Sequence, residues 1–104
     1  MDTTSVVRAW MRGDRARHRA LVTKFGKIWS YDVMVAKTAP DGTLIIYDYT
    51  ASAGNFVSRV TTSHVTAIIG TAWKEAEDGR KVIISRKVSY NKRRSYDDKR
   101  QSNR

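Results

Sequence analysis

The chain has 104 residues, no cysteine and a formal net charge of +10 at pH 7. This length fits a single domain, and the missing cysteines exclude disulfides and thiolate metal sites. The apolar runs are only a few residues long, and the N-terminus lacks the pattern of a secretory signal peptide. We therefore expect a small soluble protein with no membrane partner.

The positive charge is concentrated at the two ends of the chain. Residues 1–26 carry six basic and two acidic side chains, and residues 85–104 carry eight basic and two acidic ones. Residues 27–84 carry six of each. A neutral middle between two basic ends indicates a polyanionic partner, and nucleic acid is the main candidate.

The first expected element is a short N-terminal helix. The polar cluster of residues 3–5 can cap it, and an apolar stripe follows at Val6, Val7, Trp10 and Met11. Gly13 would end this helix. The basic stretch of residues 15–21, which follows Asp14, is compatible with a second helical turn or with a loop.

From Lys27 the periodicity changes to two, which predicts strands. The first expected strand covers residues 27–36 and places Trp29, Tyr31, Val33 and Val35 on one face. A turn at residues 39–42 joins it to a second strand at residues 44–49, because Pro40 presets φ and Gly42 supplies a positive φ. A short third strand is expected at residues 56–60, after a small polar loop.

The clearest helical stripe lies in the second half of the chain. It predicts an amphipathic helix at residues 63–77, capped by residues 61–63, with the apolar positions Val65, Ile68, Ile69, Ala72, Trp73 and Ala76. A last strand is expected at residues 82–90. The predicted fold class is therefore α+β, with a short N-terminal helix, an antiparallel sheet of about four strands and one amphipathic helix. One domain would span residues 1–90, and residues 91–104 would form a flexible basic tail.

The basic ends supply the candidate nucleic-acid contacts, mainly with phosphates. The candidate residues are Arg15, Arg17 and Arg19 near the N-terminus, and Arg86, Lys87, Lys92, Arg93, Arg94 and Tyr96 near the C-terminus. Among these, Tyr96 could stack on unpaired bases. Neither zinc-finger spacing nor a glycine-rich phosphate loop accompanies them, so we expect little sequence specificity. The alternative is a tail that only solubilises the protein.

Four aromatic residues belong to the predicted paired strands: Trp29, Tyr31, Tyr47 and Tyr49. If one face of the sheet is uncovered, some of them could form a stacking platform for single strands. The alternative is packing across strands within the core, which is the more usual arrangement for aromatic residues in paired strands.

Two histidines raise the question of catalysis. His18 lies among arginines and His64 at the start of the second helix, and with Asp32 or Asp48 they could form an acid–base site for phosphodiester cleavage. The alternative is that His64 bonds to the helix cap. Because nothing in the spacing forces these groups together, we expect no enzyme, and we also expect no metal or cofactor.

A pattern of glycine, alanine, hydroxyl and apolar residues runs through the middle of the chain, between about 10 and 68: Gly13, Ala16, Arg17, Leu21, Thr23, Gly26, Ile28, Ser30, Tyr31, Val35, Ala36, Gly42, Thr61, Thr62 and His64. In this pattern the chain resembles a family of small proteins of tailed bacteriophages and some archaeal viruses. The chain departs from the family pattern at residues 18–19, where Gly-Asn is usual, and at residues 24–25, where an acidic residue is usual. The resemblance implies a viral origin and a setting in the host cytoplasm, and it implies no activity.

The resemblance also directs attention to Ser30, Tyr31, Thr62 and His64. Hydroxyls and an imidazole at a helix N-terminus suggest an anion site formed by Thr62, His64 and Tyr31. The alternative is a structural hydrogen-bond cluster that holds the helix to the sheet.

The sequence leaves three functions open. The first and favoured one is nucleic-acid binding, to DNA or RNA, through phosphates with little sequence specificity. The second is a host-takeover or anti-defence protein that binds an acidic surface of a host protein. The third is a nuclease that depends on His64. A homodimer is also open, through the strand at residues 81–90 if that strand lies at a sheet edge.

Overall fold

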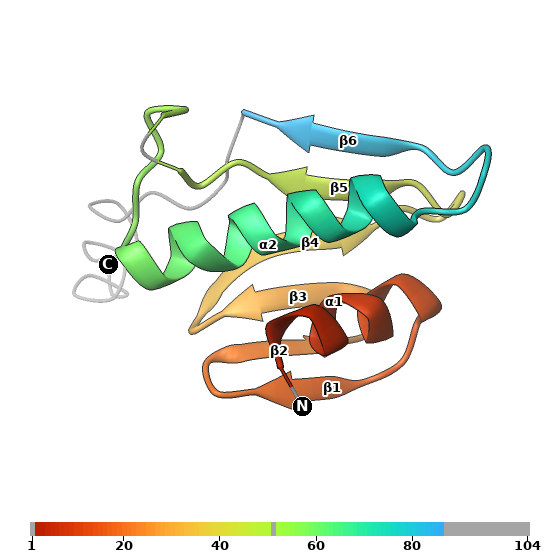
Figure 1. Ribbon diagram of the computed structural model, residues 1–104, viewed down its shortest axis with the longest axis horizontal. Helices are drawn as coiled ribbons and strands as arrows, with labels where there is room; N and C mark the ends of the chain where they lie inside the picture. The colour runs from red at the N-terminus through yellow and green to blue at the C-terminus, as the bar shows by residue number, and fades with distance from the viewer. Residues whose placement is uncertain (1, 51, 87–104) are drawn as a thin grey trace, which may run out of the picture.

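The computed structural model describes residues 2–50 and 52–86. Its elements in chain order are α1 (Thr3–Arg12), β1 (Ala16–His18), β2 (Leu21–Lys24), β3 (Lys27–Ser30), β4 (Val33–Thr38), β5 (Leu44–Tyr47), α2 (Arg59–Glu75) and β6 (Val82–Ser85). The predicted α+β class is confirmed (Figure 1). The predicted number of about four strands is wrong, because the described sheet has six strands in the order β1-β2-β3-β4-β5-β6.

Helix α1 forms where its apolar stripe predicts it, but its cap lies one residue before the predicted cluster. The Asp2 carboxylate accepts a hydrogen bond of 2.8 Å from the Ser5 backbone N–H, which satisfies one free donor of the first turn. Gly13 ends the helix in the left-handed conformation, with φ of 84°. The buried side of α1 carries Val6, Val7 and Trp10 into the core.

The additional strands come from three consecutive hairpins with two-residue turns. These turns are Arg19–Ala20, Phe25–Gly26 and Tyr31–Asp32. The stretch 15–21 is therefore neither a helical turn nor a single loop, and residues 27–36 form two strands in place of the predicted one. The first residue of each turn has a positive φ, although none of the three is glycine. The sequence analysis predicted none of these three turns, and two of them contain no glycine, proline or asparagine.

The last strand makes the sheet mixed. Strands β1 to β5 pair antiparallel in sequence order, whereas β6 pairs parallel with β5, and α2 forms the connection between them. The prediction of an all-antiparallel sheet is therefore wrong. Helix α2 carries the chain back to the end of the sheet at which β5 begins, so β6 runs parallel to β5. The predicted strand at residues 56–60 is also wrong. Ser58 is the N-cap of α2, and its Oγ accepts a hydrogen bond from the Thr61 backbone N–H.

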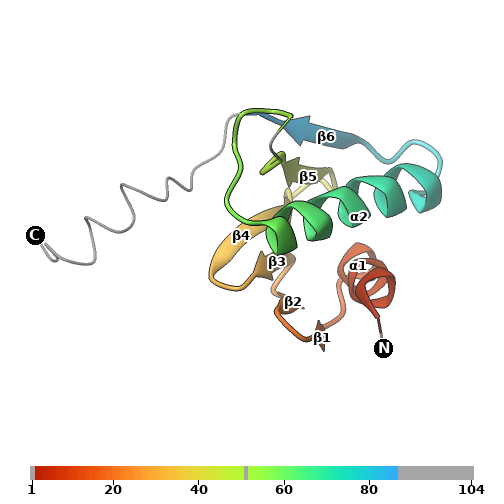
Figure 2. The ribbon, with the colours of Figure 1, turned by 60° about the vertical axis from the view of Figure 1, so that its left-hand side comes forward.

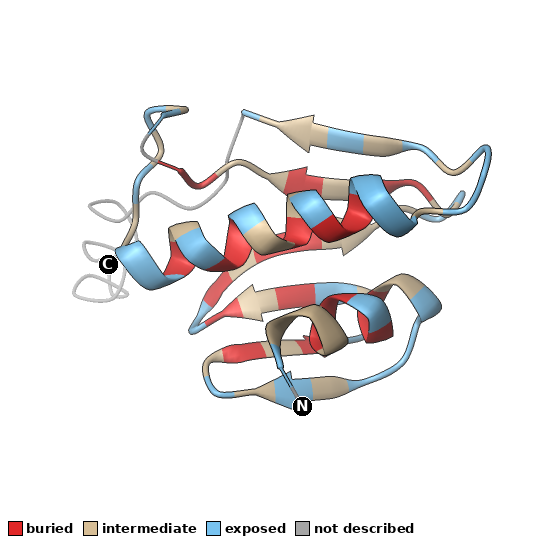
Figure 3. Cartoon of the chain, in the orientation of Figure 1, coloured by how far each residue is buried: buried red, intermediate tan, exposed pale blue. Residues whose placement is uncertain are grey.

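Both helices pack on the same face of the sheet. The views in Figures 1 and 2 place α1 and α2 side by side on this face. The buried positions of the strands and helices meet between the two layers, as Figure 3 shows, and they form one hydrophobic core. In the described part of the chain, no helix covers the other face, and none is long and apolar enough to cross a membrane.

The end of the predicted domain cannot be compared with the structure. The described part of the last strand ends at Ser85, and the residues from 87 onward, including the predicted tail 91–104, lie outside the described residues.

Candidate nucleic-acid interface

The strand register determines which side chains point away from the helices, because directly paired residues share a face of the sheet. Thr23, Ile28, Ala36 and Ile46 are paired in succession, and all of them are buried under the helices. The alternate positions form what we call the open face. Its members are Arg17, Val22, Lys24, Lys27, Trp29, Met34, Lys37, Ile45, Tyr47, Ile83 and Ser85.

Three lysines form a lateral row across neighbouring strands of the open face. Lys24 of β2 pairs with Lys27 of β3, and Lys27 pairs in turn with Lys37 of β4. We call these residues the lysine row. The ion pairs that the structure shows are Arg8–Glu75 and Arg12–Asp14, and neither involves this row. Directly opposed like charges destabilise a sheet, so the row is an unfavourable arrangement in the absence of an anion.

Aromatic side chains lie beside the lysine row. Trp29 and Tyr47 are half-buried on the open face, and Phe25, in the turn between β2 and β3, is 80% exposed. The Lys24 ammonium nitrogen lies 5.8 Å from the centroid of the Phe25 ring and 6.0 Å from that of the Trp29 ring. A cation and two ring faces therefore meet at one end of the open face.

The remaining predicted aromatics have other positions. Tyr49 is fully buried, with an exposed fraction of 1%, and it belongs to the core. Tyr31 is 60% exposed in the turn between β3 and β4, and its backbone N–H donates to the Ala20 carbonyl of the neighbouring turn. Of the four predicted aromatics, Trp29 and Tyr47 thus lie on the open face.

The predicted arginines lie around the sheet edges. Arg15, Arg17 and Arg19 are exposed at β1, which is one edge strand, and Arg86 is exposed just after β6, the other edge strand of the described sheet. Five inter-strand spacings separate these edges, a span of about 24 Å. The structure thus does not bring the two predicted basic regions together. Lys87, Lys92, Arg93, Arg94 and Tyr96 lie outside the described residues.

A buried polar cluster connects β3 with the first turns of α2 on the helix-covered side. The Ser30 Oγ lies 2.7 Å from the His64 Nδ1 and 3.0 Å from the Thr61 Oγ1. Ser30 and Thr61 are fully buried, and His64 is 9% exposed. The nearby Thr62 hydroxyl donates to the Tyr49 carbonyl at 3.3 Å. These bonds fix the helix on the sheet, which is the structural alternative weighed for these residues.

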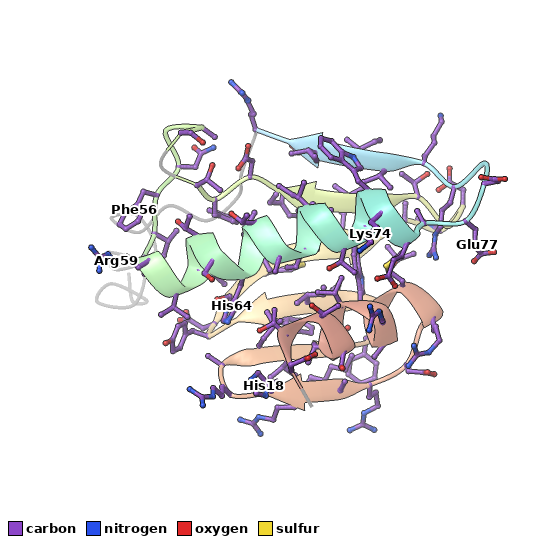
Figure 4. All side chains as sticks on the ribbon, viewed as in Figure 1. His18, Phe56, Arg59, His64, Lys74 and Glu77 are labelled. Atoms are coloured by element: carbon purple, nitrogen blue, oxygen red, sulfur yellow. The ribbon has the colours of Figure 1, made fainter. Side chains whose placement is uncertain are left out.

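The surroundings of His64 favour its neutral form. Burial lowers the pKa of His64, and the positive charge of the nearby His18 lowers it further. Figure 4 shows both side chains. A neutral, buried imidazole already bonded to Ser30 has little capacity to attract a phosphate. The anion site at Thr62, His64 and Tyr31 and the His64-dependent nuclease remain predictions.

Two hollows lie elsewhere on the described surface, and the larger, of about 490 Å³, lies between the β4–β5 turn and the segment that follows α2, where Asp41, Glu77 and Asp78 place acidic side chains. A hollow of about 200 Å³ is lined by Arg8, Met11, Arg12, Glu75, Glu77 and Arg80. There Arg8 pairs with Glu75, and the Arg80 guanidinium donates to the Met11 carbonyl, so these side chains serve the fold. Among the described residues, no group of three or more His, Asp or Glu side chains could hold a metal ion.

The lysine row is the feature that sequence reasoning missed. Its members are at positions 24, 27 and 37, and two of them lie in the segment whose net charge is zero. A count of charges along the chain therefore hides them. The signal was present in the strands themselves, because no aspartate or glutamate occurs in any of the six described strands.

Comparisons with known proteins add no relative. No family model matches the chain, and no curated protein or solved structure matches it. The resemblance to small viral proteins and the host cytoplasm that it implies therefore stay predictions. Any function has to be inferred from the arrangement of the residues.

Proposed function

We propose that the protein binds nucleic acid, mainly through phosphate contacts made by the open face and by the arginines along the β1 edge. The observation that carries this proposal is the lysine row, in which three positive charges are opposed across three neighbouring strands. Like charges that are directly opposed across two strands destabilise a sheet. A phosphate backbone placed over the row would attract all three lysines and offset the repulsion between them.

The chemistry of the whole face supports the same proposal. Arg17 lies on the open face, and Arg15 and Arg19 are exposed at the two ends of β1. The described strands contain no acidic residue that would repel a phosphate. Because the sequence carries no zinc-finger spacing or other motif for reading base edges, we expect weak sequence preference.

The test compares two double variants that lose the same charge. Lys27→Gln/Lys37→Gln removes two members of the lysine row, whereas Arg59→Gln/Lys74→Gln removes two exposed charges at opposite ends of α2 (Figure 4). Binding of fluorescent DNA and RNA is measured by anisotropy over a range of salt concentrations. The lysine-row variant should bind more weakly, with a slope of log K against log salt reduced by about 2. The affinity and the salt slope of the α2 variant should change little.

Three results would contradict the proposal. One is an equal loss of affinity in both double variants, which would mean that only the total charge of the protein matters. Another is affinity that does not depend on salt. The third is the absence of DNA and RNA binding at low salt together with capture of one stoichiometric host protein from nuclease-treated lysate. That last result would favour the host-takeover alternative, in which the same charges meet an acidic protein surface.

A further inference from the structure

We infer that the open face takes single-stranded nucleic acid, with bases stacked on Trp29 and Phe25 and the phosphate between them held by Lys24. This inference rests on the nucleic-acid binding proposed above and names its substrate class. It follows from the arrangement at the end of the open face, where the Lys24 ammonium lies within 6.0 Å of both ring centroids.

The exposure of Phe25 is the first independent support. Phe25 is 80% exposed and has a φ of 54°, in a two-residue turn where Gly26 has a φ of 74°. Positive φ at both central positions is the geometry that favours Asn-Gly, so a phenylalanine at the first position is strained. The side chain is too exposed for its burial to offset this strain. A stacking contact with a base requires an exposed aromatic ring, and Phe25 supplies one despite the unfavourable backbone conformation.

The shape of the surface favours a single strand over a duplex. The major groove of B-DNA is about 12 Å wide and admits a helix or a two-stranded ribbon, whereas a sheet of six strands spans about 24 Å. In a duplex the faces of the bases are already stacked on each other. In a single strand they are free to stack on aromatic rings, while the phosphates track a basic groove or row.

The arrangement of the two kinds of side chain fits a single strand as well. Trp29 and Met34 are directly paired on the open face, and the lysine row crosses the same strands two residues earlier in β3. On β2 to β4 the row that contains Trp29 is thus aromatic and apolar, and the adjacent row is positively charged. Phe25 lies in the turn on the far side of the lysine row, so bases stacked on Trp29 and Phe25 would place the phosphate between them over that row.

The chain provides matched controls for the test. Phe56 and Trp73 are also exposed, by 53% and 67%, but they lie before α2 and on α2, away from the open face. The variants Phe25→Ala and Trp29→Leu are compared with Phe56→Ala and Trp73→Leu. Each is checked for folding by circular dichroism and thermal unfolding. The probes are oligo(dT) and oligo(rU) of about 15 nucleotides and a DNA duplex of the same length.

We expect the wild-type protein to bind either single strand more tightly than the duplex. Phe25→Ala and Trp29→Leu should each weaken single-strand binding roughly 5- to 100-fold, the cost of losing one base–aromatic stack. They should leave duplex binding and the salt slope unchanged. Oligo(dT) should quench tryptophan fluorescence in Trp73→Leu but not in Trp29→Leu, because Trp10 is buried in the core.

The possible failures are distinguishable. If Trp29→Leu and Phe25→Ala bind single strands like the wild type while Lys27→Gln/Lys37→Gln does not, the stacking inference is overturned and phosphate binding stands. Tighter binding of the duplex than of both single strands would also overturn the inference. If no probe binds at low salt, the proposed nucleic-acid binding fails together with the stacking inference.

Discussion

Phe25 combines an unfavourable backbone conformation with almost complete exposure, so it offers a direct test of what the residue contributes to stability. In Phe25→Asn the turn becomes Asn-Gly, the pair best suited to positive φ at both positions. Relief of about 1 kcal/mol of strain should raise the Tm by roughly 4–8 °C in a domain of this size. Thermal unfolding followed by circular dichroism measures the change.

The matched control is Phe56→Asn, since Phe56 is also exposed but does not have a positive φ. This control should leave the Tm nearly unchanged. A lower Tm in Phe25→Asn would show that the phenylalanine is retained for packing and not for binding. If the stacking inference holds, the stabilised variant also loses single-strand affinity, as expected where function opposes local stability.

At the scale of residues, the sequence analysis identified several residues that interact, but it did not identify how they are arranged. It singled out Ser30 and His64 together, but it named Thr62 as their companion, and the structure places Thr61 in the cluster with them. A helical register sets this difference, because neighbouring residues of a helix point about 100° apart. Thr61 faces β3, whereas Thr62 reaches the Tyr49 carbonyl. The apolar stripe of α2, extended four residues back from Val65, passes through Thr61, but the helix was predicted to begin at residue 63, so this spacing was not applied to Thr61.

At the scale of elements, the Ser30–Thr61–His64 cluster holds α2 to β3, and its stability should depend on pH. The pKa of His64 is lowered in the folded protein, so the unfolded chain binds more protons near and below pH 6.5. The contribution is thus complete well above pH 6.5 and is lost as the pH falls through and below about 6.5. We expect the free energy of unfolding to drop between pH 7 and 5, by at most about 1.4 kcal/mol per pH unit for one group.

Urea unfolding at several pH values measures this effect. His64→Gln removes the titrating group and keeps a hydrogen-bonding side chain, so its stability should vary less over this range. His18→Gln removes the neighbouring charge that disfavours a protonated His64, so it should reduce the loss without abolishing it. The pKa values of Asp2, Asp41 and Glu75 are also lowered, but carboxylates titrate mostly below this range. An identical pH dependence in His64→Gln and the wild type would contradict the assignment.

The elements themselves differ in how far the sequence could predict them. Helix α2 was predicted at residues 63–77 and is observed at Arg59–Glu75, because its apolar period extends over four turns. The hairpins were not predicted, since the two-residue turn at Tyr31–Asp32 inverts the alternation of buried and exposed positions with neither glycine nor asparagine in the turn. The open face could not be identified until the register was known, because a shift of one residue exchanges the two faces of a strand.

At the scale of the whole molecule, the described basic groups surround the sheet instead of forming one patch. Arg17 lies at the β1 edge, the lysine row crosses β2 to β4, and Arg86 follows β6 at the far edge. The C-terminal segment after Arg86 contributes a net positive charge from its sequence alone. We therefore expect the open face and this segment to contribute separately to binding.

Additivity tests this expectation in the full chain. Lys92→Gln/Arg93→Gln/Arg94→Gln should weaken binding to single strands and duplexes alike and reduce the salt slope by about 3, one unit for each lost phosphate contact. Combined with Lys27→Gln/Lys37→Gln, the slope should fall by about 5, since independent sites add. The preference for single strands should persist in the C-terminal variant, because Trp29 and Phe25 remain. Loss of the single-strand preference in the C-terminal variant would contradict this division of roles. A salt slope of the combined variant equal to that of either separate variant would also contradict it, because the two regions would then act on the same phosphates.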